Sequence, residues 1–158
     1  MDVRKAVIAI LVIIALYSAY RGVSCAFQSD RDLVIEAMDT LTRSFADGDL
    51  SSILGCLSED FEVVWRRETL SREELADHLR ILFFQGGRII LTGGIQRLDM
   101  EPDGDKDRAH VEWEGEAREK GSGVGRYGGD VYRGTGNLTF RREGGSWLLA
   151  AAEMRGRR

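Results

Sequence analysis

The chain has 158 residues, of which 43% are hydrophobic and 30% are charged, and its net charge is −4. This length and hydrophobic content allow one globular domain of ordinary size with a short appendage. Because charges of both signs are mixed along the chain, no broad basic surface exists to hold a phosphate backbone, and we expect no nucleic acid partner.

An apolar segment near the N-terminus departs from this mixed composition. Arg4 and Lys5 are followed by AVIAILVIIALYSAY, fifteen residues without a charge, before Arg21 interrupts the run. As a helix this run would reach about 22 Å, which is short of the roughly 30 Å hydrocarbon core of a bilayer. The following GVSCAF would extend the span if Arg21 snorkels to the interface. Length alone therefore leaves the role of residues 1–28 open.

Three interpretations of residues 1–28 compete: a retained signal anchor, a signal peptide cleaved after Ala26, and a lipid-modified segment at Cys25. We favour the anchor, because the residues just before the cleavage site are poorly suited to it. In all three cases the positive-inside rule keeps the preceding basic residues in the cytoplasm and exports the rest. We expect a single-pass protein of the cytoplasmic membrane whose domain, residues 29–156, faces outward into the periplasm or the extracellular space, or is secreted if the segment is cleaved.

Two helices and a strand are predicted in succession after this segment. Ser29 or Asp30 can cap a helix whose apolar residues recur every three and four positions as far as the sequence ADGD. Asp49 or Ser51 then begins a short helix, and the apolar run FEVVW after Asp60 indicates a strand. The stretch FADGDLSSILGCLSEDFEV is therefore a corner, in which a long helix folds back through a short one into the first strand.

The third predicted helix lies in TLSREELADHLRILFFQGG. Ser71 stands at its cap with Glu74 three positions later, which is the pattern of a capping box. Four strands follow, in RIILTGGIQRLDME, DRAHVEWEGEARE, GDVYRGTGNLTFRRE and SWLLAAAEMR. Glycines at which a curved sheet would bend lie inside them, at Gly93, Gly94, Gly134 and Gly136. Helices followed by strands predict an α+β domain, with three helices packed on one face of a curved antiparallel sheet.

The order helix, short helix, strand, helix and strand meander resembles the nuclear transport factor 2-like superfamily, whose members include SnoaL-like and ketosteroid-isomerase-like proteins. The corner FADGDLSSILGCLSEDFEV and the closing strand GGSWLLAAAEM carry this resemblance, which spans about residues 30 to 156. It implies a cone-shaped half-barrel around an apolar pocket. Because it rests on element order and not on a catalytic motif, it predicts the fold better than the activity.

The resemblance does not extend to the isomerase mechanism. A gapless alignment of the corner puts the isomerase's tyrosine at Leu41 and its proton-abstracting aspartate at Trp65. Leucine cannot donate a hydrogen bond to an enolate oxygen, and tryptophan cannot take a proton. The acidic pair Glu59 and Asp60 falls outside the pocket in this alignment, and we interpret it as a cap and turn. We therefore assign no catalytic residue.

One predicted strand carries His110 followed by an acidic row, Glu112, Glu114 and Glu116. These residues alternate along the strand, so all four side chains point to one face of the sheet. A histidine and carboxylates on one face could ligate a metal, but Ala109, Val111 and Trp113 have the opposite parity and should face the helices. The acidic row then lies on the convex face, opposite Arg133 and Arg141 on the neighbouring strand. We expect no metal site and no cofactor.

The lining of the cone is the remaining candidate site. The side chains expected there are Trp65, Trp113, Tyr132 and Phe140, with Leu41 and Met38 from the first helix. They would either surround a cavity for a small apolar ligand or fill the space themselves. We favour a filled or nearly filled core, because aromatic stripes at strand spacing usually pack together. His78, at the edge of the third helix's apolar face, is either a half-buried, hydrogen-bonded residue or part of the pocket.

Two functional hypotheses follow. The first is a membrane-anchored, non-catalytic domain that binds a small apolar ligand or a protein partner, with a homodimer formed through the convex sheet face. The alternative is an isomerase, dehydratase or cyclase-type enzyme that acts on a hydrophobic small molecule in the cone. An enzyme needs an ionisable group inside the pocket, and the candidates for it are His78, Asp130 and Glu153.

Overall fold

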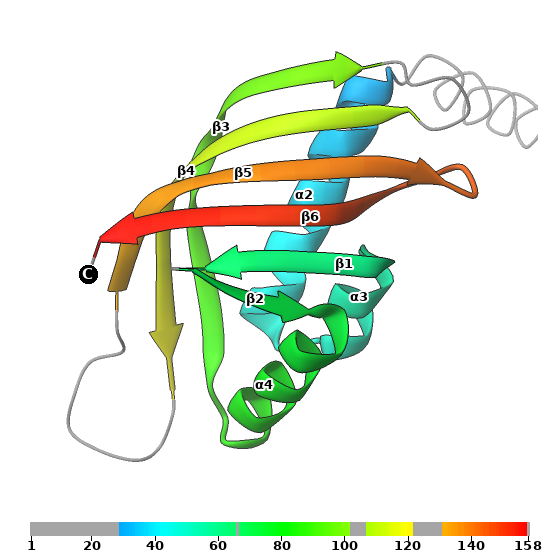
Figure 1. Ribbon diagram of the computed structural model, residues 1–158. Coiled ribbons are helices and arrows are strands. Elements are labelled where there is room, and N and C mark those ends of the chain that lie inside the picture. Colours follow the sequence, from blue (N-terminus) through cyan, green and yellow to red (C-terminus); the bar gives the residue numbers. More distant parts are fainter. Residues whose placement is uncertain (1–28, 66, 102–106, 122–130, 158) are drawn as a thin grey trace, which may run out of the picture. The chain divides into compact units, whose positions relative to one another are not determined.

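The computed structural model describes residues 29–65, 67–101, 107–121 and 131–157 (Figure 1). The predicted anchor or signal segment, residues 1–28, lies outside this range. Within the range, no helix combines the length and the apolar character needed to cross a membrane. The chain divides into two compact units, Met1–Leu33 and Val34–Arg158, and the second holds every strand of the described residues.

The predicted corner is confirmed, with its capping residues in place. Helix α2 (Asp30–Asp47) begins after Ser29, whose hydroxyl accepts from the backbone N–H of Asp32 at 3.3 Å. Gly48 ends this helix with a φ of +70°, a conformation that favours glycine. Asp49 then caps helix α3 (Leu50–Gly55), because its carboxylate accepts from the backbone N–H of Ser52 at 3.1 Å.

Strand β1 (Leu57–Trp65) begins earlier than predicted, and Glu59 and Asp60 lie inside it. Their interpretation as a cap and turn is therefore wrong. The reason is the pairing of β1 with strand β6 (Ser146–Arg157), which extends back to Cys56, whose carbonyl accepts from Leu149 N–H at 2.9 Å. The register shifts between Leu57 and Glu62, so the acidic pair lies in an irregular part of the strand and not in a turn.

A short strand, β2 (Glu68–Ser71), was not predicted. It pairs antiparallel with β1 after a turn at Arg67, which has a φ of +83°. Four residues are too few for an alternating pattern to be visible in the sequence. Helix α4 (Arg72–Phe84) follows, and its predicted capping box is confirmed: the carboxylate of Glu74 accepts from Ser71 N–H at 2.8 Å while the Ser71 hydroxyl accepts from Glu74 N–H.

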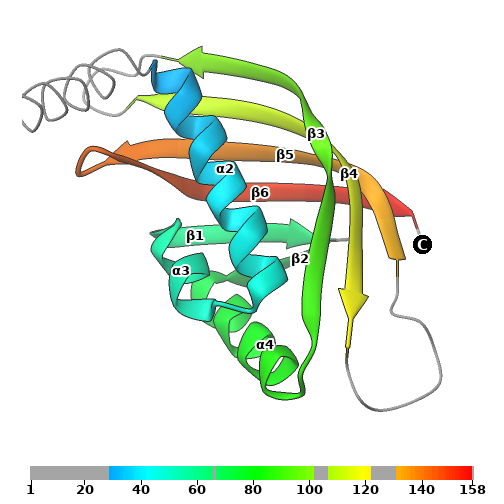
Figure 2. The same ribbon diagram turned by 180° about the vertical axis from the view of Figure 1, so that it is seen from behind.

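The sheet is completed by strands β3 (Arg88–Glu101), β4 (Arg108–Lys120) and β5 (Val131–Glu143), in the order β2-β1-β6-β5-β4-β3. All neighbours are antiparallel except β1 and β6, which are parallel. The expectation of a wholly antiparallel sheet is thus wrong at this one pairing, where the last strand returns beside the first. The sheet curves around α2, and the helices lie on its concave side (Figures 1 and 2).

A row of four glycines crosses the sheet in register. Gly93 pairs with Gly115, Gly115 with Gly134, and Gly134 with Gly156. A Cβ atom at Gly115 would lie 2.2 Å from the carbonyl oxygen of Thr92, and one at Gly134 would lie 2.1 Å from that of Arg155. At these two positions the neighbouring backbones therefore approach too closely for any side chain. We call this row the glycine crease, and we attribute to it the sharp bend of the long strands (Figure 1).

The hydrophobic core lies between the concave face and the helices. Ala109 and Val111 are 0% and 1% exposed, which confirms that this parity of β4 faces the helices. Phe140 on β5 and Ile53 on α3 are also fully buried. The remaining buried apolar residues are Val34, Leu41, Leu57, Phe61, Ala76, Leu79, Leu98, Trp147, Leu149 and Ala152.

Candidate functional site

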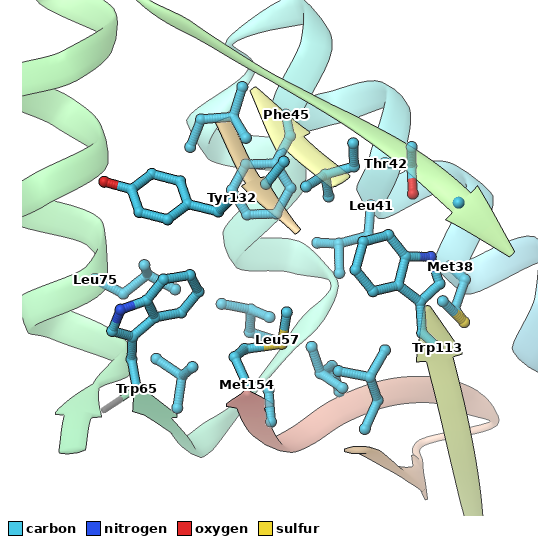
Figure 3. A pocket seen from close by; sticks show the side chains of 18 of the residues that line it. Met38, Leu41, Thr42, Phe45, Leu57, Trp65, Leu75, Trp113, Tyr132 and Met154 are labelled. Atoms are coloured by element: carbon cyan, nitrogen blue, oxygen red, sulfur yellow. The ribbon is translucent and has the colours of Figure 1, made fainter. Parts of the chain in front are cut away.

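A cavity of about 620 Å³ opens on the concave face of the sheet (Figure 3). Helices α2 and α4 and strands β1, β3, β4, β5 and β6 contribute to its wall. The prediction of a filled or nearly filled core is therefore wrong. The labelled lining residues of Figure 3 are Met38, Leu41, Thr42, Phe45, Leu57, Trp65, Leu75, Trp113, Tyr132 and Met154.

A methionine and a glycine separate the two tryptophans across the sheet. Trp65 pairs with Met154, Met154 with Gly136, and Gly136 with Trp113, so one row across four strands carries both tryptophans. The Met154 sulfur occupies the place beside Gly136, 2.9 Å from where a Cβ would be. The two tryptophans consequently stand on opposite sides of the cavity instead of packing together (Figure 3). In the next row, Ala152 adds only a methyl group.

Five of the six predicted lining residues are in place. Trp65, Trp113 and Tyr132 line the cavity from the sheet, and Met38 and Leu41 line it from α2. Tyr132 meets Trp65 edge to face, with ring centroids 5.5 Å apart. Phe140 instead packs in the core, 1% exposed, and is not among the described residues that line the cavity. Its predicted place on the wall is wrong: it shares the parity of Tyr132 on β5, but it lies further along the strand, where it pairs with Ala109 and Leu149 and is buried.

The ionisable candidates lie elsewhere. His78 is exposed on α4, where its Nδ1 lies 2.7 Å from the carbonyl oxygen of Glu74, so it is neither half-buried nor part of the described cavity wall. Glu153 lies on the other face of the sheet, where it accepts from the guanidinium of Arg155 at 2.7 and 2.9 Å. Asp130 is outside the described residues.

Four polar residues of the cavity wall were missed by the sequence analysis: Asp39, Thr42, Arg118 and Glu119. Glu119 pairs with Ile89 of the lining and has the same strand parity as Trp113. The alternation of side chains along the strand could therefore have predicted its place on the wall. Asp39 follows Met38 on α2, at the edge of the helix's apolar face. Helical periodicity does not decide there whether a side chain faces the cavity or the solvent.

The convex face is covered with ion pairs. Glu116 accepts from Arg133 and Arg118, each at 2.9 Å, and both bonds lower its pKa, the one to Arg133 by more. The predicted partner Arg133 is confirmed. His110 contacts Glu101 at 3.2 Å. Among the residues described, no group of three or more histidine, cysteine or acidic side chains could hold a metal. Pairing of two chains through this face stays a prediction.

The predicted pairing of Arg141 with the acidic row is wrong. Its guanidinium binds both carboxylate oxygens of Asp60, at 2.6 and 3.2 Å, and donates from Nε to Glu143 at 2.6 Å. The Arg141 guanidinium lowers the pKa of Asp60 to about 2. Asp60 is therefore a surface ion-pair partner and not part of the cavity, as expected for the acidic pair.

No protein-family model matches the chain, and no curated protein matches it in sequence. A solved structure from Novosphingobium aromaticivorans, provisionally assigned as a scytalone dehydratase, has 13% identity over 82% of this chain and 85% of its own, with a TM-score of 0.67. A provisionally assigned dehydratase of the NTF2-like family from Streptomyces avermitilis has 15% identity over 80% and 95%, with a TM-score of 0.60.

A third structure, of a protein of unknown function from Mycobacterium tuberculosis, has 16% identity over 80% of this chain and 70% of its own, with a TM-score of 0.60. The described domain has the nuclear transport factor 2-like fold. Identities this low show the fold alone. In this domain, Leu41 and Trp65, where the gapless alignment puts the isomerase's functional groups, both line the cavity with apolar side chains.

Proposed function

We propose that this NTF2-like domain binds a small, predominantly apolar ligand in the concave cavity. The observation that carries the proposal is an open cavity of about 620 Å³ walled by Trp65, Trp113, Tyr132 and aliphatic side chains. Ligand sites in proteins typically measure roughly 300–1,000 Å³ and are mostly apolar. Burial of apolar ligand surface here contributes about 25 cal/mol per Å² before the entropic costs of association.

We further propose that binding occurs without catalysis. Leucine and tryptophan occupy the two positions at which the resemblance to the isomerase would require a phenol and a carboxylate. Recognition of a protein partner through the convex face is a separate proposal, and its ion pairs make that surface polar.

The test is calorimetric titration of the full chain with cyclododecanol, a neutral apolar probe. Ala152 lies on the cavity wall, whereas the adjacent Ala151 is exposed on the opposite face of β6. Ala152→Trp should therefore fill the cavity and weaken cyclododecanol binding at least about tenfold, while the control Ala151→Trp leaves it unchanged. Equal affinity in the two variants, or no binding to the parent chain, would refute the proposal.

A dehydratase-type enzyme is the second candidate, supported by the two dehydratase-like neighbours and by a carboxylate, Asp39, on the cavity wall. In such a reaction the carboxylate takes the α proton of a β-hydroxyketone, the C=C bond forms as the bond from the β carbon to oxygen breaks, and the carboxylic acid returns that proton to the leaving hydroxide to give water. Apolar β-hydroxyketones incubated with the chain would then form enones, seen by ultraviolet absorbance, and Asp39→Asn would abolish the reaction. Failure of a broad panel to react would favour the binding function.

We also propose that residues 1–28 hold the domain at the outer side of the cytoplasmic membrane, on the basis of the uncharged run between Lys5 and Arg21. The full chain should then resist extraction of membranes with alkaline carbonate, and Ile13→Lys should release it. A chain recovered without residues 1–26 would instead identify a cleaved signal peptide.

A further inference from the structure

The wall of the concave cavity extends along the strands on both sides of the glycine crease. Ala152 pairs with Leu138 on one side of the crease, and Ala117 pairs with Tyr132 on the other. All four side chains line the cavity. Leu138 and Tyr132 are six positions apart on β5, with Gly134 of the crease between them, which corresponds to about 20 Å along the strand. The wall therefore continues past the bend of the sheet.

Helix α2 gives an independent measure of this length. Its Asp39, next to Met38, belongs to the wall. Just past the other end of the helix, a Cβ atom at Gly48 would lie 2.6 Å from the guanidinium of Arg88, which precedes the lining residue Ile89. Nine positions separate Asp39 from Gly48, which corresponds to about 14 Å along the helix axis. Both measures describe a cavity that is elongated.

The two ends of the cavity are formed by different elements. Figure 3 shows Trp113 with Met38 at one end and Tyr132 at the other. Of the two carboxylates on the described wall, Asp39 follows Met38 at the first end. Glu119 lies past the row of Tyr132 on β4, at the second end. Between its ends the described wall therefore presents mostly apolar side chains to a ligand.

We propose that the ligand is a long, unbranched hydrocarbon chain that lies across the glycine crease, and not a compact ring. Such a chain buries methylene groups along the whole wall, and each buried methylene raises the affinity about fourfold before the cost of ordering the chain. A compact ring with the same number of carbon atoms occupies one side of the crease only. This inference rests on the proposed function, because it names the ligand class of the same cavity.

The test compares 1-dodecanol with cyclododecanol, which holds the same number of carbon atoms in a ring. Both are titrated by calorimetry into the full chain and into two variants that fill opposite sides of the crease, Ala117→Phe and Ala152→Trp. The chain should bind at least about tenfold more weakly to each variant, because either ring displaces several of its methylenes. Cyclododecanol should lose affinity in Ala152→Trp and stay within about twofold in Ala117→Phe.

Glu114→Phe is the matched control for Ala117→Phe. It places the same ring on β4, but at an exposed position on the convex face. It should bind both probes as the parent chain does. The retained affinity of Ala117→Phe for cyclododecanol reports that this variant is folded.

A series of 1-alkanols gives a second measurement, which needs no variant. In the parent chain the affinity should rise at least about fivefold for each two carbon atoms added from 1-octanol to 1-dodecanol, because the added methylenes extend along the wall past the crease. In Ala117→Phe this rise should be absent.

The outcomes separate the two proposals. The chain inference is overturned, while ligand binding stands, if 1-dodecanol binds Ala117→Phe as tightly as it binds the parent chain. Equal losses of the ring and the chain in both variants overturn it as well, and so does a parent chain that gains no affinity beyond 1-octanol. If neither 1-dodecanol nor cyclododecanol binds the parent chain, the proposed function fails and the chain inference fails with it.

Discussion

Trp65 and Tyr132 meet edge to face, with their ring planes at 82°, although strand β6 lies between the strands that carry them. Trp65 belongs to the cross-strand row of Gly136, whereas Tyr132 lies on the other side of Gly134 along β5. The glycine crease therefore separates the two rings along the sheet, and the bend at the crease lets them touch. The aromatic wall of the cavity depends on this bend.

Substitutions in the glycine crease should destabilise the domain more than substitutions beside it. Gly115→Ala would place a Cβ 2.2 Å from the carbonyl oxygen of Thr92, while Gly94→Ala meets nothing within 4 Å. We expect Gly115→Ala to lower the free energy of unfolding by at least about 2 kcal/mol and Gly94→Ala to change it by less than about 0.5 kcal/mol. Urea denaturation measures both, and equal losses would show that the crease does not require glycine.

Removal of an aromatic ring from the cavity wall should destabilise the domain less than removal of an aromatic ring from the core. Phe140→Ala leaves a cavity in the core and should cost about 3–5 kcal/mol of unfolding free energy. Trp65→Ala removes a partly exposed ring and its contact with Tyr132, and should cost less, about 1–3 kcal/mol.

Ligand binding should show the reverse order. Trp65→Ala removes part of the wall and should weaken cyclododecanol binding, whereas Phe140→Ala, if folded at the assay temperature, should retain it. Calorimetric titration checks this. Weaker binding in Phe140→Ala than in Trp65→Ala would contradict the position of Phe140 away from the cavity.

The ion pair between Asp60 and Arg141 predicts a pH-dependent contribution to stability. Because the folded-state pKa of Asp60, about 2, is below its ordinary value of 3.8, the stabilisation is present above pH 3.8 and is lost as the pH falls through 2. The Asp60 side chain is 66% exposed, so solvent screens the pair and Asp60→Asn should cost about 0.5–1 kcal/mol at pH 7.

Urea denaturation between pH 7 and pH 2 tests this dependence. The difference in unfolding free energy between the parent chain and Asp60→Asn should shrink toward zero at the acid end of this range, where the carboxylate is protonated. Glu59→Gln, a change at the exposed neighbouring acid, should show little difference at any pH. A constant difference across the whole range would exclude the ion pair as its cause.

Loss of the capping box should destabilise α4. The Ser71 hydroxyl satisfies the backbone N–H of Glu74, which has no partner within the helix. Ser71→Ala should therefore cost about 1 kcal/mol, and Ser71→Asp, which keeps an acceptor at the cap, should cost much less. Thermal or urea unfolding distinguishes the two. Equal losses would mean that the hydroxyl acceptor is not what stabilises the helix start.

Local signals in the sequence were sufficient for the helices and most of the strands. The capping residues Ser29, Asp49 and Ser71 act on backbone groups within three positions, so their effect can be inferred without the rest of the fold. Strand parity likewise turned Trp113 inward and Glu116 outward, because side chains alternate along any strand. The order of these elements was enough to suggest the fold.

The cavity and the ion pairs were decided by contacts between residues far apart in the chain. Gly115 and Gly156 complete the crease only because four strands align in one register, which no single strand's pattern contains. Register also places Met154 and Gly136 between the two tryptophans, so the rings stand apart around a cavity that we expected to be filled. Asp60 pairs with Arg141 across 81 positions of the chain. Periodicity specifies which face a side chain occupies, but its neighbour on that face depends on how the strands pair.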